Sequence, residues 1–449
     1  MNASILPGIY QVSSDILNIQ TVKLIIIGER QRKVTRRMTA DIKAIPFIPG
    51  DGIGPEIMAA AQTVVDAAVE NAYAGEKKIE WKRFPAGEEA YQKNENYLPE
   101  STICAIQSHK VGIKGPLRTP IGGGFRSLNV ALRQTLDLYV CLRPVRWMEG
   151  LPSPHHDPAG IDLAIFRENT EDLYAGIEYE AGTEEHLKWM QGYSKTIPED
   201  YKRLPHPQET GIGIKPVSKP NTQRLVSAAL QWALDNNRKR VTLVHKGNIM
   251  KFTEGAFMRW GYETVESAFG SHTYTRRQYR ETAGKQGVPT AETEKTNAIA
   301  DGKVWVDDVI ADVVFEQLIT RPQNFDVIAT TNLNGDYISD AAAALAGGVG
   351  ISPGANINFS VGTALFEANH GSADAIAGKD KANPSSLILS AEMMLRYIGW
   401  EAAADRIHQG VTKTIREKTV TFDLAAQING AQVLGTQSFA EAIINNMRG

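Results

Sequence analysis

Short apolar segments with the length of β-strands alternate along this chain with longer segments that have the composition of helices. The strand-like segments are residues 44–49, 111–114, 138–142, 161–166, 241–244 and 326–329. A helix is expected from Pro55 to about Ala74, because small apolar residues recur through it and proline is favoured in the first helical turn. Such alternation favours an α/β architecture over one in which strands and helices form separate layers.

The length and composition are those of a soluble protein with more than one domain. The 449 residues can bury a large core, and length alone suggests two or three domains. A formal charge of −3 with mixed signs gives no reason to expect a nucleic-acid or membrane partner. Cys104 and Cys141 are the only cysteines, which excludes a disulfide scaffold and fits a reducing compartment. No apolar run approaches the roughly 18–20 residues that span a bilayer, so we expect a cytoplasmic protein.

Residues 122–146 suggest a site for an anion with several oxygens. They open with three glycines, after which Ser127 and Asn129 offer small polar side chains. Arg133 follows, and Arg143 comes directly after a strand-like segment. Guanidinium groups bind carboxylates and phosphates in bidentate fashion, so a polycarboxylate or phosphate ligand is predicted. On these residues alone, the alternative that the arginines are solvated surface charges stays open.

Two further strand ends carry residues suited to the same kind of site. The segment 161–166 leads into Arg167, with Tyr174 close behind, and the segment 241–244 is followed by Lys246. A third arginine strengthens the polyanion interpretation. A lysine whose pKa is lowered by burial or by nearby cations can transfer protons. The alternative for Lys246 is an ordinary exposed lysine.

Two pairs of carboxylates are spaced for one face of a helix. Asp336 and Asp340 are four residues apart at an expected helix start, and Asp308 and Asp312 have the same spacing in an expected helix over 307–318. Carboxylates so paired repel each other unless they share a cation. Oxygen ligands without histidine or cysteine suit Mg²⁺ or Mn²⁺ rather than Zn²⁺. The alternative is that Asp336 and Asp340 are helix N-terminal acids favoured by the helix dipole.

Several stretches depart from the strand–helix alternation. Residues 50–54 read G-x-G-x-G, so we expect a tight turn rather than the dinucleotide-binding G-x-G-x-x-G. Residues 1–43 are expected to form an N-terminal arm, with one strand near 24–27. Residues 181–216 resemble an excursion or small subdomain. Residues 274–303 are polar and are expected to form an inserted surface loop with about one helical turn.

Several distant motifs together resemble one family. GGGFRSLNVALRQ, LRPVR, LVHKGNIMKFTEGAF and NLNGDYISD are similar to the decarboxylating isocitrate dehydrogenases of the bacterial homodimeric type, and so is HGSA-x-x-IAG. The likeness runs from about Ile45 to the C-terminus and omits the arm and residues 274–303. It implies the isocitrate/isopropylmalate dehydrogenase-like α/β fold, which is not a Rossmann fold. The implied parts are a large domain (44–138 and 347–449), a small domain (139–171 and 219–346) and a clasp segment (172–218) that interlocks two subunits.

The resemblance implies oxidative decarboxylation of isocitrate to 2-oxoglutarate and CO₂, a step of the tricarboxylic acid cycle. The implied substrate-binding residues are Ser127, Asn129, Arg133, Arg143 and Arg167. The implied metal ligands for Mg²⁺ or Mn²⁺ are Asp336, Asp340 and, from the neighbouring subunit of a homodimer, Asp312. Lys246, also from the neighbouring subunit, would help to remove the hydroxyl proton, and Tyr174 would protonate the product carbon. The active sites would therefore be shared between subunits.

The cofactor-binding residues implied by the resemblance are Lys114, Thr119, His370, Gly371, Asp374, Ala375, Ile376 and Asn383. In NADP-using members a lysine, two tyrosines and an arginine hold the 2′-phosphate, and here Ala375, Ile376, Phe422 and Ala426 stand at those positions. Asp374 could accept a bond from a free ribose 2′-hydroxyl and repel a phosphate. We therefore expect NAD as the cofactor. Arg118, next to Thr119, also departs from the family pattern.

Alternatives remain open at this point. The same reaction could use NADP⁺, or the substrate could be homoisocitrate or tartrate, although Ser127 and Asn129 favour isocitrate. A regulatory, non-catalytic subunit is the alternative of a different class. That alternative would lead us to expect loss of the lysine, tyrosine or metal acids, yet all are present. Ser127 could also be the target of a regulatory kinase, because a phosphate there would repel a substrate carboxylate.

Overall fold

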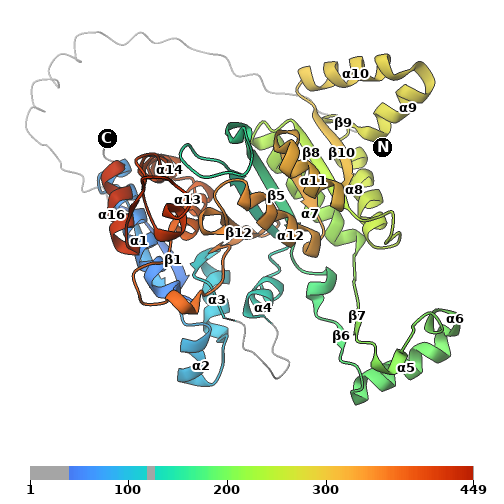
Figure 1. Ribbon diagram of the computed structural model, residues 1–449, viewed down its shortest axis with the longest axis horizontal. Helices are drawn as coiled ribbons and strands as arrows, with labels where there is room; N and C mark the ends of the chain where they lie inside the picture. The colour runs from blue at the N-terminus through green and yellow to red at the C-terminus, as the bar shows by residue number, and fades with distance from the viewer. Residues whose placement is uncertain (1–39, 119–126, 448–449) are drawn as a thin grey trace, which may run out of the picture. The chain divides into compact units, whose positions relative to one another are not determined.

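One large mixed sheet forms the centre of the described part of the chain (Figure 1). The computed structural model describes residues 40–118 and 127–447, so Thr119 and the expected strand near 24–27 lie outside the described part. The sheet has eleven strands in the order β2-β1-β3-β13-β12-β4-β5-β11-β8-β10-β9. β12 is antiparallel to both of its neighbours, and β4 is antiparallel to β5, whereas the other neighbouring strands are parallel.

The strands of this sheet are β1 (Asp41–Ile48), β2 (Lys77–Arg83), β3 (Val111–Lys114), β4 (Val140–Arg146), β5 (Asp162–Glu168), β8 (Arg240–His245), β9 (Thr273–Thr275), β10 (Val304–Ile310), β11 (Val327–Thr330), β12 (Pro353–Asn358) and β13 (Thr363–Ala368). Two short pairs, β6 (Glu178–Tyr179) with β7 (Ile212–Gly213) and β14 (Thr419–Val420) with β15 (Gln432–Val433), lie outside it. Each of the six strand-like segments overlaps an observed strand. β1, however, begins at Asp41 and takes in the last residues of the expected arm.

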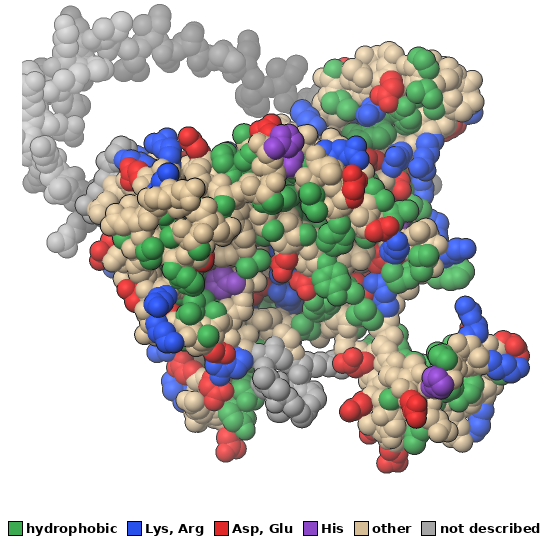
Figure 2. Space-filling view, viewed as in Figure 1, with side chains coloured by type: hydrophobic (Ala, Val, Ile, Leu, Met, Phe, Trp, Pro, Cys, Tyr) green, Lys and Arg blue, Asp and Glu red, His purple; other side chains and the backbone are tan. Residues whose placement is uncertain are grey.

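The helices are α1 (Gly54–Tyr73), α2 (Glu88–Asn94), α3 (Glu100–His109), α4 (Leu128–Thr135), α5 (Glu184–Thr196), α6 (Pro198–Tyr201), α7 (Lys219–Asp235), α8 (Glu254–Ala268), α9 (Arg276–Gln286), α10 (Val288–Ala300), α11 (Ala311–Thr320), α12 (Asn332–Ala344), α13 (Ser385–Tyr397), α14 (Glu401–Arg416), α15 (Phe422–Ala425) and α16 (Thr436–Asn446). α1, α13, α14 and α16 pack against one another (Figure 1). Within the described part, no helix is both long and apolar enough to cross a membrane. Acidic and basic side chains are interspersed over the face seen in Figure 2.

The glycine-rich turn before α1 brings two distant loops together. Gly52 has a φ of 58°, and a Cβ there would lie 2.1 Å from the backbone oxygen of Ser372. Only glycine fits such an approach in that conformation. Ile53 N donates to the same oxygen at 2.9 Å. The expected tight turn therefore holds the loop that follows β13 against the start of α1.

Two expectations about local structure are wrong. Residues 307–318 do not form one helix, because β10 ends at Ile310 and α11 begins at Ala311. Asp308 consequently lies on a strand, where it accepts a bond from Tyr262 Oη at 2.7 Å, and it does not share a helix face with Asp312. Residues 274–303 are not a loop, because α9 and α10 form a helical pair there. The Trp305 ring packs against Tyr279 and lies under the Lys295 ammonium, which anchors that pair to β10.

The division into a large and a small domain stays a prediction. The sheet is continuous, and the boundary would fall between β12 and β4, which pair through Ala355–Ile357 and Val140–Leu142. In the described part, the larger apolar core contains residues of α1, α13 and α14 and continues through α7 and α8 of the predicted small domain, and a second core lies among β5, α11 and α12. The predicted clasp segment contains β6, α5, α6 and β7. Its role between subunits also stays a prediction.

Candidate active site

Two buried arginines project from neighbouring strands toward α12. In the β4–β5 register Arg167 lies opposite Cys141, two positions from Arg143, so both arginines are on one face of the sheet. Their side chains are 1% and 7% exposed. Arg167 pairs with Asp336, and its Nε donates to Asn332 at 2.8 Å. Arg143 and Arg167 are therefore buried in the structure, and the alternative that they are solvated surface charges does not hold for them.

Gly335 explains how α12 approaches so closely. A Cβ at this position would lie 2.6 Å from Arg167 Cγ. The glycine of the NLNGD motif therefore makes room for the arginine stem, and the helix can then present Asp336 and Asp340 to the guanidinium groups. Arg143 Nη1 lies 3.2 Å from Asp340 and 3.6 Å from Asp336.

The environments of these two carboxylates differ. Burial alone would raise the pKa of Asp336, but Arg167, a hydrogen bond from Tyr174, and Arg143 outweigh burial and lower it. Asp340 is only partly buried, but partial burial still outweighs Arg143 and raises its pKa. Asp340 is 57% exposed, so its oxygens are accessible. Burial, followed by its bond to Asp336, raises the pKa of Tyr174 and keeps the phenol protonated.

A second buried ion cluster lies beside the first. Arg133 on α4 donates to Glu367 Oε1 at 2.7 Å, and Lys114 at the end of β3 lies 2.5 Å from Glu367 Oε2. Asn356 Nδ2 also donates to Glu367, at 2.7 Å. Burial would raise the pKa of Glu367, but Lys114 and Arg133 outweigh it and hold the pKa well below its usual range. The Lys114 ammonium, expected to contact the cofactor, is committed to this cluster.

Some buried polar atoms around the clusters have no partner. Asn129 Oδ1, Arg133 Nε and Arg143 Nε are buried and make no hydrogen bond with the described residues. A buried polar group without a partner costs free energy, so such atoms commonly await a ligand. One acceptor and two donors of this kind fit a ligand that carries carboxylates and a hydroxyl. Ser127, the residue before α4, is half-buried next to them.

Lys246 and Asp312 form a separate pair. Lys246 follows β8 and its Nζ lies 2.6 Å from Asp312 Oδ1 at the start of α11. The bond from Lys246 lowers the pKa of Asp312. Over residues 40–118 and 127–447, no three acidic, histidine or cysteine side chains gather to hold a metal ion. Within the described part of this chain, Asp312 therefore does not join Asp336 and Asp340.

Six of the eight expected cofactor residues lie on the loop between β13 and α13, whereas Lys114 is at the end of β3 and Thr119 lies outside the described part. His370 is on this loop, and burial lowers its pKa and favours the neutral imidazole. Its Nε2 is buried without a partner. Asn383 is engaged with Asp423 at 2.9 Å. Gly371, Ala375 and Ile376 lie in the same loop, the last two in a 3₁₀ turn.

Asp374 is not a free carboxylate. Arg118 Nη2 lies 2.5 Å from Asp374 Oδ1, and Arg118 Nε donates to Oδ2 at 3.1 Å. The bond from Arg118 lowers the pKa of Asp374. In addition, Lys379 Nζ lies 2.8 Å from the backbone oxygen of Ala375. Two cations therefore lie close to the part of the loop where Asp374 was expected to be a free acid.

Sequence reasoning missed two carboxylates that organise these loops. Glu367 lies within the apolar run of β13, and an acid in such a run was a signal that could have identified it. Asp51 accepts from Glu88 N at 3.0 Å and from Arg118 N at 2.8 Å. Nothing in the spacing of Asp51 indicated that it would tie three loops together.

Comparisons with known proteins now identify the family. The model of the isocitrate/isopropylmalate dehydrogenase family matches residues 44–443. The chain belongs to this family. The crystal structure of an isocitrate dehydrogenase from Methylococcus capsulatus aligns with a TM-score of 0.70 and 37% identity, and the alignment covers 90% of this chain and 99% of that one. The expected isocitrate/isopropylmalate dehydrogenase-like fold is confirmed.

Curated relatives of this family member are named NADP isocitrate dehydrogenases. One from Staphylococcus aureus (strain MSSA476) is 54% identical over 90% of this chain and 95% of its own length. One from Coxiella burnetii is 51% identical over 96% and 98%. These names overturn the expectation of an NAD-dependent enzyme, which is wrong. The physical reason lies at Asp374, because a carboxylate paired with Arg118 does not repel a phosphate as a free one would.

Proposed function

We propose that this chain catalyses the oxidative decarboxylation of isocitrate to 2-oxoglutarate and CO₂, with NADP⁺ as the hydride acceptor. Membership of the family and the names of its relatives support the reaction. The observation that carries the proposal is the convergence of three buried arginines, two of which have an unpartnered Nε, next to an oxygen-only acid pair. Such an arrangement suits a substrate with several carboxylates.

The substrate would be held mainly by the arginines. Isocitrate has three carboxylates and one hydroxyl, and Arg133, Arg143 and Arg167 supply donors for the carboxylates. Asn129 Oδ1 would accept a hydrogen bond from the ligand, and Ser127 would donate one. Since the guanidinium groups are already fixed by Glu367 and Asp336, little side-chain entropy is lost on binding.

Asp336 and Asp340, with Asp312 of a second copy, would hold Mg²⁺ or Mn²⁺. Their carboxylate oxygens are the donors that these hard cations prefer. When bound, the metal supplies Lewis-acid stabilisation of negative charge on the substrate oxygens. Asp336 pairs with Arg143 and Arg167, so it would hold the metal next to these two guanidinium groups.

Proton transfer would fall to two residues on different elements. Lys246 would accept the proton of the substrate hydroxyl, and Tyr174 would donate a proton to the carbon that loses CO₂. The raised pKa of Tyr174 fits a donor, because the phenol stays protonated at neutral pH. The regulatory-subunit alternative is disfavoured because both groups and all three acids are present.

A homodimer with shared sites accounts for the separation of Lys246 and Asp312 from Asp336. Exposed apolar side chains support a second copy on this side. Phe252, which follows Lys246, is 87% exposed, and Tyr337, next to Asp336, is 58% exposed. Apolar surface of this kind is typical of interfaces between chains. The clasp segment 172–218 would add to the same assembly.

A regulatory kinase could act on Ser127, where a phosphate would repel the substrate carboxylates.

NADP⁺ would lie along the loop with His370, Gly371 and Asn383. Lys379 and Arg118 would offset its phosphate charge. The cytoplasmic location remains a prediction.

Steady-state kinetics test the proposed function. Isocitrate, homoisocitrate and tartrate would be compared with NADP⁺ and NAD⁺, with Mg²⁺ or Mn²⁺ present and after chelation. We expect turnover of isocitrate with NADP⁺ that requires the metal. Absence of turnover would overturn the enzyme proposal, and faster turnover of homoisocitrate or tartrate would move it to the alternative substrate.

A further inference from the structure

A cavity of about 690 Å³ is lined by residues other than those of the candidate active site, although Ala343 of α12 takes part in it. Side chains alternate between the two faces of a strand. On β4, Leu142 and Pro144 line the cavity, whereas Arg143 between them reaches α12 on the other face. On β13, Phe366 lines it, whereas Glu367 joins the buried ion cluster. None of the proposed substrate, metal or proton-transfer residues lines this cavity.

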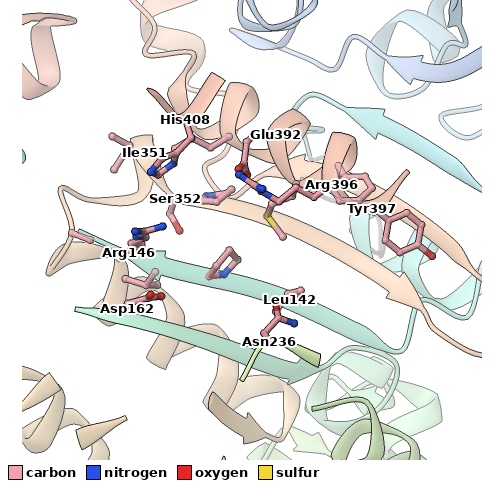
Figure 3. Close-up of a pocket in the computed structure, with 18 of the residues that line it drawn as sticks. Leu142, Arg146, Asp162, Asn236, Ile351, Ser352, Glu392, Arg396, Tyr397 and His408 are labelled. Atoms are coloured by element: carbon pink, nitrogen blue, oxygen red, sulfur yellow. The ribbon is translucent and has the colours of Figure 1, made fainter. Parts of the chain in front are cut away.

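The walls of the cavity are largely apolar, and they come from both sides of the β12–β4 boundary. Pro144 comes from β4 and Phe366 from β13, whereas Leu389, Met393 and Tyr397 come from α13. A volume of this size is typical of a pocket for a small organic ligand, and apolar walls favour an apolar body. Figure 3 shows charged side chains at the same cavity.

Arg146 is the cation of this cavity that lacks a partner. Its cross-strand neighbour Asp162 pairs with Arg238 at 2.9 Å. Glu392 on the facing helix pairs with Arg396 at 2.7 Å. Among the described residues the Arg146 side chain makes no hydrogen bond or ion pair, although its charge acts on Glu392 through space. All the N–H donors of its guanidinium group are therefore available to a ligand.

A histidine lines the cavity together with Arg146. His408 on α14 lines the cavity, and burial, Arg146 and Arg396 together lower its pKa. Figure 3 shows Arg146 and Asp162 on one wall and His408, Glu392 and Arg396 on the helices opposite. Three acids line the cavity, and each pairs with another arginine: Asp162 with Arg238, and Glu392 and Asp405 with Arg396. One further anionic group would therefore complete the pairing of Arg146.

We propose that this cavity binds a small amphipathic monocarboxylate. The carboxylate pairs with Arg146 beside His408, and the apolar body lies against Pro144, Phe366 and Met393. A single unpaired guanidinium matches one anionic group, and the apolar walls disfavour a second. The site is separate from the proposed isocitrate site, and the ligand would contact strands on both sides of the β12–β4 boundary.

A fluorescence displacement assay tests this proposal. The full-length protein would be titrated with anilinonaphthalene sulfonate, an anionic apolar dye that brightens in apolar pockets, and then with octanoate, octanol or octylamine. We expect saturable dye binding that octanoate displaces, with octanol weaker by about tenfold for lack of the charged bond. Octylamine should displace least. Displacement by NADP⁺ or isocitrate would place the dye in the active site and overturn the proposal.

Two substitutions and a matched control locate the site. Arg146→Glu reverses the charge of an exposed side chain and should weaken octanoate about tenfold or more. Met393→Trp fills the apolar part and should weaken both octanoate and octanol. Arg280→Glu makes the same charge change on exposed α9 and should leave binding unchanged. Unchanged octanoate affinity in Arg146→Glu, or equal losses in Arg146→Glu and Arg280→Glu, would overturn the proposal.

Discussion

The Asp336 cluster and the Lys246–Asp312 pair are both expected in the active site, but they differ in burial and in completeness. In the first, Arg167 and Arg143 are 1% and 7% exposed and Asp336 is 28% exposed. In the second, Lys246 is 32% exposed and Asp312 is 64% exposed. The Asp336 side chain has several partners, whereas Lys246 and Asp312 bond chiefly to each other.

This difference shows which side chains a single chain holds in place before a ligand binds and which side chains it leaves free to move. Buried ions are costly unless they are paired, so the Asp336 cluster is held by its own chain before any ligand arrives. An exposed pair contributes little to stability and is free to exchange partners. If the site is shared, Lys246 and Asp312 act in the neighbouring copy, and their exposure in a single chain follows directly.

The largest expected effect comes from a substitution in the buried Asp336 cluster. Asp336→Asn removes the carboxylate that faces both arginines and would hold the metal, and should lower kcat with isocitrate about 10³-fold or more. Asp301→Asn, an exposed acid outside the cluster, is the matched control and should retain activity. Activity within tenfold of wild type in Asp336→Asn would remove Asp336 from the site.

Mixing two inactive variants tests whether Lys246, from the exposed pair, acts in the site of the neighbouring subunit. Lys246→Met and Tyr174→Phe should each lower kcat about 10²–10⁴-fold, because each removes a proton-transfer group. If each site takes Lys246 from one subunit and Tyr174 from the other, a heterodimer of the two variants contains one intact site. Co-refolding them should recover about a quarter of wild-type activity in a random dimer mixture. No recovery, despite heterodimers detected by mass spectrometry, would show that the site is not shared.

The second buried cluster should dominate acid stability. Glu367→Gln leaves Lys114 and Arg133 buried without their counter-charge and should cost about 3–5 kcal/mol of unfolding free energy. The pKa of Glu367 is lowered by folding, so its contribution is complete above its ordinary value of 4.5 and is lost as pH falls toward the folded value. Urea unfolding from pH 3 to 7 should therefore show a flatter pH dependence in Glu367→Gln than in wild type.

The control for that measurement is an exposed carboxylate. Glu281→Gln removes a partner of Lys285 on the surface of α9, and it should change stability little at any pH. Equal losses in Glu281→Gln and Glu367→Gln would show that burial of the Glu367 cluster does not carry the effect.

The sequence predicted those elements whose pattern is local. The strand-like segments and the acid pair on α12 were predicted because apolar runs and four-residue spacing depend on near neighbours. The run VWVDDVIADVVF was misassigned because it is apolar enough for either period, and β10 passes into α11 without a loop. Residues 274–303 lack an apolar stripe, and their helices depend on packing against Trp305.

The contacts that set the charge of the site are long-range, so the sequence could not supply them. Glu367 meets Arg133 across 234 positions, and Arg118 meets Asp374 across 256. Spacing says nothing about such pairs. The error about the cofactor has this origin, because Asp374 was considered without Arg118. Arg118 and Asp374 both depart from the family pattern, and because they pair with each other their effects have to be considered together.

The smallest expected effect tests that pairing. Arg118→Ala leaves Asp374 unpaired beside the proposed phosphate position and should raise the KM for NADP⁺ about twofold to fivefold, since an exposed ion pair is weak. The double variant Arg118→Ala/Asp374→Ala removes both charges and should return the KM toward the wild-type value. A lost structural contact would instead raise the KM equally in the single and double variants. Raising the salt concentration should shrink the Arg118→Ala effect, because exposed charges are screened. Comparison of these variants thus separates the charge of Asp374 from the position of its loop.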